Sequence, residues 1–339
     1  MKFTLKLLLA FILFVVLTAI NLLSKKMIES FSKKEQILFI SNDLFGNGHL
    51  EILESLIVKN HEIIKKKIDF DKIYILSQTN DKSFITYIEN KYPTVSVIKD
   101  KENIKYDYFI NGTINPDCGK NKYDTKIKGV KTCLPIEDLK KKNHYYISHK
   151  VNKQFNNTNT FYLTPLCNSN NYIMADVLPF TENKTKIDYP VFLIIGHSTM
   201  RNNNILEEIL DKYDNHNKKF LIKYMSRKAP KLKKKYNNLK ICKNYDFVNF
   251  HKEILDCHCM LMLISKSNQP QYYKYQLTSS INYIIAYKMK AIIDQELKGI
   301  YNLNDSDCYI YNSKDKNSII NQFEKVIEDF NAENKLKAI

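Results

Sequence analysis

Short apolar blocks alternate with segments of helical periodicity along most of the chain. Blocks bounded by polar turns indicate strands, whereas apolar residues at spacings of three and four indicate helices. Strands that alternate with helices predict parallel sheets covered by helices on both faces. The predicted strands are 36–41, 72–76, 95–98, 106–110, 145–148, 160–163, 190–196, 219–224, 239–242, 259–264 and 291–293, and the predicted helices are 50–64, 83–90, 205–213, 247–255, 276–287 and 318–330. The stretch 111–142 is polar and predicted to be irregular.

The pattern divides the chain into two similar halves. A polar stretch at 179–188, bracketed by Pro179 and Pro190, is the expected interdomain linker. Each half begins with a strand, which predicts an α/β fold of two facing Rossmann-like domains, at 35–185 and 186–339. Ligands bind beyond the carboxyl ends of the strands in such sheets, so the loops that follow the strands are the candidate functional segments.

The first 34 residues form a separate leader. Residues 5–23 are almost continuously apolar, and lysines flank the run on both sides. As a helix at ~1.5 Å per residue, residues 7–23 span about 25 Å, slightly less than a hydrocarbon core of ~30 Å. No cleavage site of the A-x-A type follows, which favours an uncleaved signal anchor over a removed signal peptide. We expect a single-pass membrane protein of type II with its domain in the ER or Golgi lumen. N-glycosylation sequons compatible with that side occur at Asn111, Asn156, Asn183 and Asn304.

The composition is that of a basic globular protein. Hydrophobic residues make up 44% and charged residues 26%, which excludes a largely disordered chain. The 52 Lys and Arg against 36 Asp and Glu give a net charge of +16, so anionic partners come into question. The lysine clusters at 65–67, 140–142 and 231–235 are interpreted as solvated faces, and no nucleic-acid partner is expected.

The seven cysteines form no metal-binding pattern. Cys257 and Cys259 flank His258 within an apolar run, which favours a buried strand over a metal site. Cys118 and Cys133 flank a polar loop and can form a disulfide if the domain faces an oxidising lumen.

The richest polar constellation is 270–280, which follows a predicted strand and leads into a helix. Hydroxyls near a helix N-terminus suit a diphosphate, because unpaired N–H groups and the helix dipole attract anions. A lysine adds positive charge, and tyrosines offer an aromatic face or a phenolic donor. The alternative is an ordinary Ser/Thr helix cap preceded by packing tyrosines. The candidate donor-binding residues here are Tyr272, Tyr273, Lys274, Thr278, Ser279 and Ser280.

A second candidate phosphate site follows the strand that ends at Gly196. Ser198, Thr199 and Arg201 open the next helix there. Glycine permits close backbone approach, and an arginine can bind a phosphate through two parallel hydrogen bonds. The alternative is a surface arginine in a helix cap.

In the first half, Gly46, Asn47, Gly48 and His49 follow the first predicted strand, and His149 follows the tyrosine-rich strand. Either imidazole can deprotonate an acceptor hydroxyl or stabilise a departing phosphate, because its reference pKa lies near working pH. The alternative for the first group is a strand-to-helix turn in which Asn47 or His49 caps the helix.

The segment 249–301 resembles the donor-binding region of GT-B glycosyltransferases of the kind found in large DNA viruses and algae. Within this segment the likeness is carried by the blocks 250–256 (FHKEILD) and 271–281 (QYYKYQLTSSI). The blocks 146–149 (YISH) and 161–165 (FYLTP) match further blocks of such proteins, and the likeness covers the second half of the chain better than the first. It implies a nucleotide-diphosphate sugar as donor and a hydroxyl of a glycan or glycoprotein as acceptor. It also implies that the loop after Gly196 faces the donor diphosphate and that 42–49 lines the acceptor side of the cleft. No cofactor is expected, and no metal ion, since helix N-termini and basic side chains stabilise the leaving diphosphate.

One departure from this family concerns acidic residues. Retaining members often carry two glutamates seven residues apart in the donor segment, whereas 266–269 reads KSNQ and no glutamate lies between Tyr272 and Lys290. Asp294 and Glu296 are candidate substitutes. Two alternatives therefore stay open: another group transferase acting on sugars, and a non-catalytic, membrane-tethered module that binds glycan or nucleotide.

Overall fold

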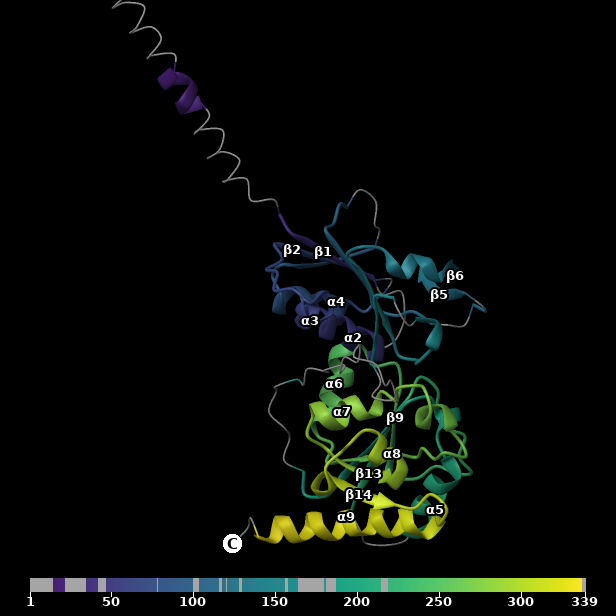
Figure 1. Ribbon diagram of the computed structural model, residues 1–339. Helices are drawn as coiled ribbons and strands as arrows, with labels where there is room; N and C mark the ends of the chain where they lie inside the picture. Colours follow the sequence, from purple (N-terminus) through teal and green to yellow (C-terminus); the bar gives the residue numbers. More distant parts are fainter. Residues whose placement is uncertain are drawn as a thin grey trace, which may run out of the picture.

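Two parallel sheets lie one above the other and form the body of the molecule (Figure 1). The computed structural model describes residues 15–21, 35–41, 47–77, 79–99, 104–115, 118–119, 121–127, 130–155, 158–163, 180, 187–214 and 219–336.

The first sheet has the order β3-β2-β1-β4-β7-β8, with every neighbouring pair parallel. Numbered by their sequence within the sheet, the strands lie in the order 3-2-1-4-5-6, which is the Rossmann order. Its strands are β1 (Ile37–Ser41), β2 (Lys72–Leu76), β3 (Val95–Ile98), β4 (Tyr108–Asn111), β7 (His144–Ser148) and β8 (Thr160–Tyr162), and its helices are α2 (Asn47–Val58), α3 (Asn60–Ile64) and α4 (Lys82–Lys91).

The second sheet repeats this order as β11-β10-β9-β12-β13-β14, again parallel throughout. Strand β9 reads VFLII and all five residues are buried, because helices cover both faces of a central parallel strand. The strands are β9 (Val191–Ile195), β10 (Leu221–Met225), β11 (Leu239–Cys242), β12 (Cys259–Leu261), β13 (Lys290–Asp294) and β14 (Cys308–Tyr311), and the helices are α5 (Asn203–Tyr213), α6 (Phe247–Leu255), α7 (Ser280–Ala286), α8 (Gln295–Ile300) and α9 (Lys316–Leu336).

These sheets confirm the predicted α/β fold with two Rossmann-like domains. The prediction that 111–142 is irregular was wrong, because β5 (Lys122–Ile127) and β6 (Val130–Pro135) form an antiparallel hairpin there. A disulfide joins Cys118 to Cys133 next to this hairpin, as considered from the sequence. Strand β14 and helix α8 were not predicted, and the expected boundary at 185/186 lies outside the described residues.

The two domains meet through helices that begin at the carboxyl ends of their sheets. Asp81 caps α4 by accepting the N–H of Phe84 at 3.1 Å, and its second oxygen accepts the N–H of Phe247 at 2.6 Å. One carboxylate therefore serves the positive ends of α4 and α6, one helix from each domain. The Phe247 side chain packs into the core of the first domain, so the domains share buried apolar surface as well.

Only a small part of the leader is described. Residues 15–21 are helical, whereas most of the expected membrane span at 5–23 lies outside the described residues. Within the described part of the chain, no helix has both the length and the apolar character needed to cross a bilayer. Among the sequons, Asn111 is buried at the end of β4, so its side-chain amide is not accessible for attachment of a glycan. Asn304 is exposed.

Candidate functional site

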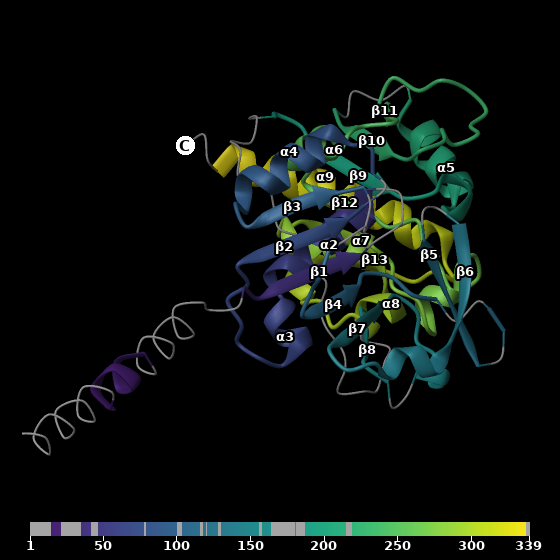
Figure 2. The same ribbon diagram turned by 90° about the horizontal axis from the view of Figure 1, so that it is seen from above.

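The carboxyl-end loops of the two sheets are hydrogen-bonded to each other. The N–H of Val151 donates to the carbonyl of Tyr275 at 2.8 Å, and the N–H of Leu277 donates to the carbonyl of His149 at 3.1 Å. Figure 2 shows the first domain lying over the second in the view from above. The loop after β7 thus meets the segment after β12, where a doubly wound fold binds its ligands.

Arg201 is buried beneath this junction, with 8% of its surface exposed. Its Nε and Nη2 donate to the carbonyl of Ile195 at 3.1 and 2.5 Å, and Nη1 donates to the carbonyl of Met200 at 3.1 Å. Nη2 also lies 3.5 Å from the hydroxyl of Ser280, the first residue of α7. The structure therefore brings together the two predicted phosphate segments, through Arg201 and Ser280.

The contacts of Arg201 with the described residues are all neutral. Burial lowers the pKa of Arg201 below its usual value, and nearby Tyr272 and Tyr224 oppose this shift only in part. A buried cation without a carboxylate is costly, because water and counter-charge are both removed. The alternative of a surface arginine is therefore wrong: this guanidinium is an interior group whose charge no described residue balances.

Gly196 makes room for this arginine. Its φ is +126°, and a Cβ there would collide with the Arg201 guanidinium. The neighbouring hydroxyls differ in access, since Ser198 is buried and Thr199 is exposed with its Oγ1 at 2.8 Å from His197 Nδ1. Of the two, Thr199 alone presents its side chain to solvent.

Tyr272 and Tyr273 are buried, whereas Lys274 is exposed. The hydroxyl of Tyr273 donates to the carbonyl of Ile264 at 3.4 Å, and burial followed by the Asp294 charge raises the pKa of Tyr273 well above its usual value. The tyrosines therefore pack in the core, which agrees with the alternative of packing tyrosines before a helix cap. Lys274 faces solvent, where it can contact an anion.

Helix α7 begins at Ser280, four residues later than predicted. Residues 276–279 instead form an irregular strip that pairs with the first domain through a bridge between Lys150 and Gln276. Thr278 is buried and its N–H donates to the hydroxyl of Tyr301 at 3.2 Å, whereas Ser279 is exposed. The segment that precedes the candidate phosphate ligands Ser279 and Ser280 thus connects the two domains.

The two candidate acidic substitutes are already engaged. Asp294 caps α8 by accepting the N–H groups of Glu296 and Leu297 at 3.1 and 3.2 Å. Glu296 is half exposed and forms an ion pair with Lys266 at 2.6 Å. Glu296 therefore lies beside the loop after β12, although not in the family position.

In the candidate acceptor-side segment, α2 begins at Asn47 rather than at Leu50. Asn47, Gly48 and His49 therefore form the first turn of a helix and not a loop, and Gly46 lies outside the described residues. His149 is half-buried directly after β7, and its Nδ1 is inaccessible to solvent. The structure places His149, and not the described part of the Gly46 segment, in contact with the candidate donor segment 270–280.

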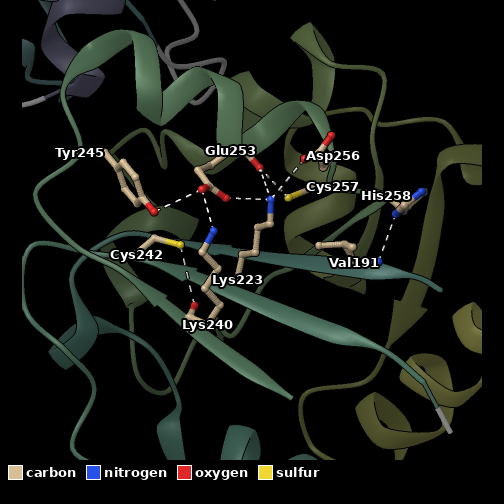
Figure 3. Close-up of polar contacts among 9 residues, drawn as sticks. All are labelled: Val191, Lys223, Lys240, Cys242, Tyr245, Glu253, Asp256, Cys257 and His258. Atoms are coloured by element: carbon tan, nitrogen blue, oxygen red, sulfur yellow. Dashed lines mark hydrogen bonds and ion pairs between the residues drawn. The ribbon is translucent and has the colours of Figure 1, made fainter. Parts of the chain in front are cut away.

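A second polar cluster lies within the second domain (Figure 3). Buried Lys223 on β10 forms ion pairs with Glu253 at 2.8 Å and Asp256 at 3.8 Å, and Glu253 also accepts from Lys240 at 2.7 Å. Cys257 is buried here, and burial raises its pKa to about 12, so the thiol stays protonated. Across the described residues, no group of three or more His, Cys, Asp or Glu side chains is arranged to hold a metal ion.

Sequence reasoning missed Glu51, His251 and Tyr283, which meet between the domains. Glu51 and Glu54 are carboxylates within the mostly apolar block LEILESLI, and a charge at such a buried position requires a partner. That signal marks both glutamates as unusual without identifying their partners.

No protein-family model and no curated protein matches the chain. Solved structures overlap with it at low identity. A glycosyltransferase from Rickettsia africae ESF-5 has a TM-score of 0.49 at 9% identity, over 86% of this chain and 88% of that chain. The E. coli heptosyltransferase WaaC with ADP has a TM-score of 0.40 at 11% identity, over 88% and 98%. A Listeria monocytogenes protein described as a UDP-N-acetylglucosamine 2-epimerase has a TM-score of 0.43 at 8% identity, over 88% and 90%.

Proposed function

We propose that the chain is a glycosyltransferase of the GT-B type that transfers a sugar from a nucleotide-diphosphate donor to a hydroxyl of a glycan or glycoprotein. The observation that carries this proposal is Arg201, a buried cation with neutral partners at the carboxyl end of the second Rossmann sheet. An anion bound there balances the charge, and two facing Rossmann sheets leave the acceptor to the opposite domain.

The residues divide the reaction between the domains. Arg201, with Ser280 beside it, and solvent-facing Lys274, Thr199 and Ser279 stabilise the diphosphate as negative charge develops on it. His149, on the first domain, acts on the acceptor hydroxyl as general base. No cofactor or metal ion is needed in this scheme, because the protein's own donors and cations carry the leaving-group charge.

Thermal shift of the full chain in detergent tests donor binding with UDP, GDP and ADP and their sugar conjugates. A nucleotide at 100 times its Kd stabilises the protein by about 2.7 kcal/mol, which raises Tm by several degrees. Release of nucleoside diphosphate from the best nucleotide sugar then tests turnover. A protein that neither binds any of these nucleotides nor releases a diphosphate from them is not a glycosyltransferase of this kind.

The non-catalytic binding module remains the second candidate, because Asp294 and Glu296 are engaged in a helix cap and an ion pair. That candidate predicts that nucleotides raise the Tm of the protein. It also predicts that no nucleoside diphosphate is released during long incubation of a nucleotide sugar with mixed glycan acceptors.

We further propose that residues 5–23 anchor the protein in a membrane, with the two domains in the ER or Golgi lumen. Four large apolar side chains of the short described helix are about half exposed, which suits a lipid environment; they are Val15, Val16, Leu17 and Ile20.

A further inference from the structure

A carboxylate of the first domain is buried between the two domains. Glu51, on the first turns of α2, is 4% exposed. The hydroxyl of Tyr283, on α7, donates to its Oε1. The Nε2 of fully buried His251, on α6, lies 3.2 Å from the same oxygen, in ion-pair reach although not aligned for a hydrogen bond.

The second ring nitrogen of His251 also has a polar contact. His251 Nδ1 lies 2.5 Å from the hydroxyl of Tyr287, which accepts the N–H of Phe180 at 3.4 Å. Phe180 stacks on the His251 ring at 4.9 Å and on Tyr87 of α4 at the same distance. With the proton on Nε2, Nδ1 accepts from the Tyr287 hydroxyl, and the Nε2 proton lies near Glu51 without forming an aligned hydrogen bond.

Both described contacts of the Glu51 carboxylate come from the other domain. A buried carboxylate loses its hydration, so removing its donors leaves a polar group with no compensation. Rotation of one domain against the other breaks the contacts of Glu51 with Tyr283 and His251, whereas loss of these donors in the closed pose leaves the carboxylate buried without compensation. The network therefore opposes domain opening.

Helix α7 connects this contact to the candidate donor site. Tyr283 lies three residues after Ser280, whose hydroxyl is beside Arg201. Residues at i and i+3 lie on neighbouring positions of one helix face. Glu51 thus binds the same helix that contacts the buried cation, and it does so from the domain that carries the acceptor side.

We propose that Glu51 is a positioning residue: through Tyr283 and His251 it holds the two domains in the closed pose in which the loop after β7 pairs with the donor segment. This role rests on the proposed function only for its catalytic consequence. The domain contact itself is measurable without any substrate.

Hydrogen exchange of the full chain tests the closed pose. The N–H groups of Val151 and Leu277 are bonded across the domains, so peptides containing them report opening directly. Tyr283→Phe removes one hydroxyl and Glu51→Ala removes the carboxylate; each should speed exchange at both peptides about 10- to 100-fold. Glu51→Gln, which keeps an acceptor oxygen for Tyr283, should show a smaller increase.

Tyr309→Phe is the matched control. The Tyr309 hydroxyl donates to Asp329 at 2.9 Å, which is also a bond from a buried tyrosine to a carboxylate, but both residues belong to the second domain. This variant should lower Tm without speeding exchange at the interdomain peptides. Unchanged exchange at those peptides in Tyr283→Phe and Glu51→Ala, in proteins that fold, overturns the proposal.

A catalytic readout separates this proposal from the proposed function. If the wild type releases diphosphate, Tyr283→Phe should lower kcat at least about 10-fold, since small misplacements of reacting groups are costly, while the Kd of the nucleoside diphosphate stays within about threefold. A weakened Kd with normal kcat contradicts the positioning role. If the wild type binds no nucleotide, the function fails, but the exchange result still decides the role of Glu51 in domain closure.

Discussion

The guanidinium of Arg201 lies 3.5 Å from the hydroxyl of Ser280, across 79 residues of sequence. This contact joins the loop after β9 to the start of α7, which are the two segments that the sequence had indicated independently as phosphate sites. Arg201 also donates to the carbonyls of Ile195 and Met200. The same side chain therefore stabilises the local fold and supplies the positive charge that an anion would balance.

Arg201→Ala should lower both stability and nucleotide affinity. The change leaves the carbonyls of Ile195 and Met200 without their donors, which we expect to cost about 1–3 kcal/mol of unfolding free energy. Urea unfolding with and without a nucleoside diphosphate measures both effects, and the stabilisation by nucleotide should largely disappear.

Lys274→Ala is the companion variant. It removes a positive charge from an exposed position of the proposed donor segment, so the free energy of unfolding should stay within about 0.5 kcal/mol of wild type. A variant of Arg201 that retains full nucleotide stabilisation would place the diphosphate elsewhere.

His149→Ala should cut turnover by about 100-fold or more without weakening nucleotide binding, because a general base contributes about 10²–10⁴-fold. The backbone carbonyl that accepts from Leu277 is retained in this variant, so the interdomain bridge should persist. Turnover and Tm are measured on the same preparation. A merely packing histidine would show the reverse result, with lower Tm and normal activity per folded molecule.

Reduction of the Cys118–Cys133 disulfide should destabilise the hairpin region. The two cysteines are 15 residues apart, and closure of a loop of that length stabilises by about 3 kcal/mol in the chain-entropy description. Unfolding with and without reductant measures the difference, and Cys118→Ser should reproduce it. Equal stability in all three conditions would show that the bond does not form in solution.

The ion pairs of Lys223 predict a specific dependence on pH. Burial by itself raises the pKa of Glu253, but hydrogen bonds from Lys223 and Lys240 outweigh it, so the pKa lies below its usual value. A carboxyl with a lowered folded pKa contributes stability above its unfolded pKa and loses it as pH falls through the folded one. Stability should therefore decline below about pH 4.5, the ordinary value for glutamate.

Lys223→Met tests the origin of that decline. Loss of the buried cation should cost about 3 kcal/mol at neutral pH, since Glu253 and Asp256 lose a shared partner, and it should make the acid decline shallower. Free energies of unfolding at a series of pH values, for wild type and variant, give both numbers. Parallel curves would exclude Lys223 as the cause.

Alkaline carbonate extraction of membranes tests the proposed anchor. A protein that keeps residues 5–23 in a bilayer should stay in the pellet, because carbonate removes peripheral proteins but not spanning helices. Recovery in the supernatant, with an N-terminus that begins after residue 23, would identify a cleaved leader instead.

The sequence by itself determined the class of fold. Apolar blocks such as 191–195 and helical periodicity such as 247–255 depend on local pattern, because a strand buried on both faces and an amphipathic helix each impose a period on the chain. The hairpin at 122–135 was not predicted because its strands are largely polar and lack a regular apolar alternation.

The tertiary structure decided what the polar residues do. The Rossmann strand order, the burial of Arg201 under Gly196 and the meeting of Glu51 with Tyr283, 232 residues apart, depend on long-range contacts that no local period encodes. The same holds for residues 276–279, which the helical pattern assigned to α7. Gln276 forms a bridge with Lys150, and the Leu277 N–H donates to the His149 carbonyl, so hydrogen bonds to the first domain replace helical ones there.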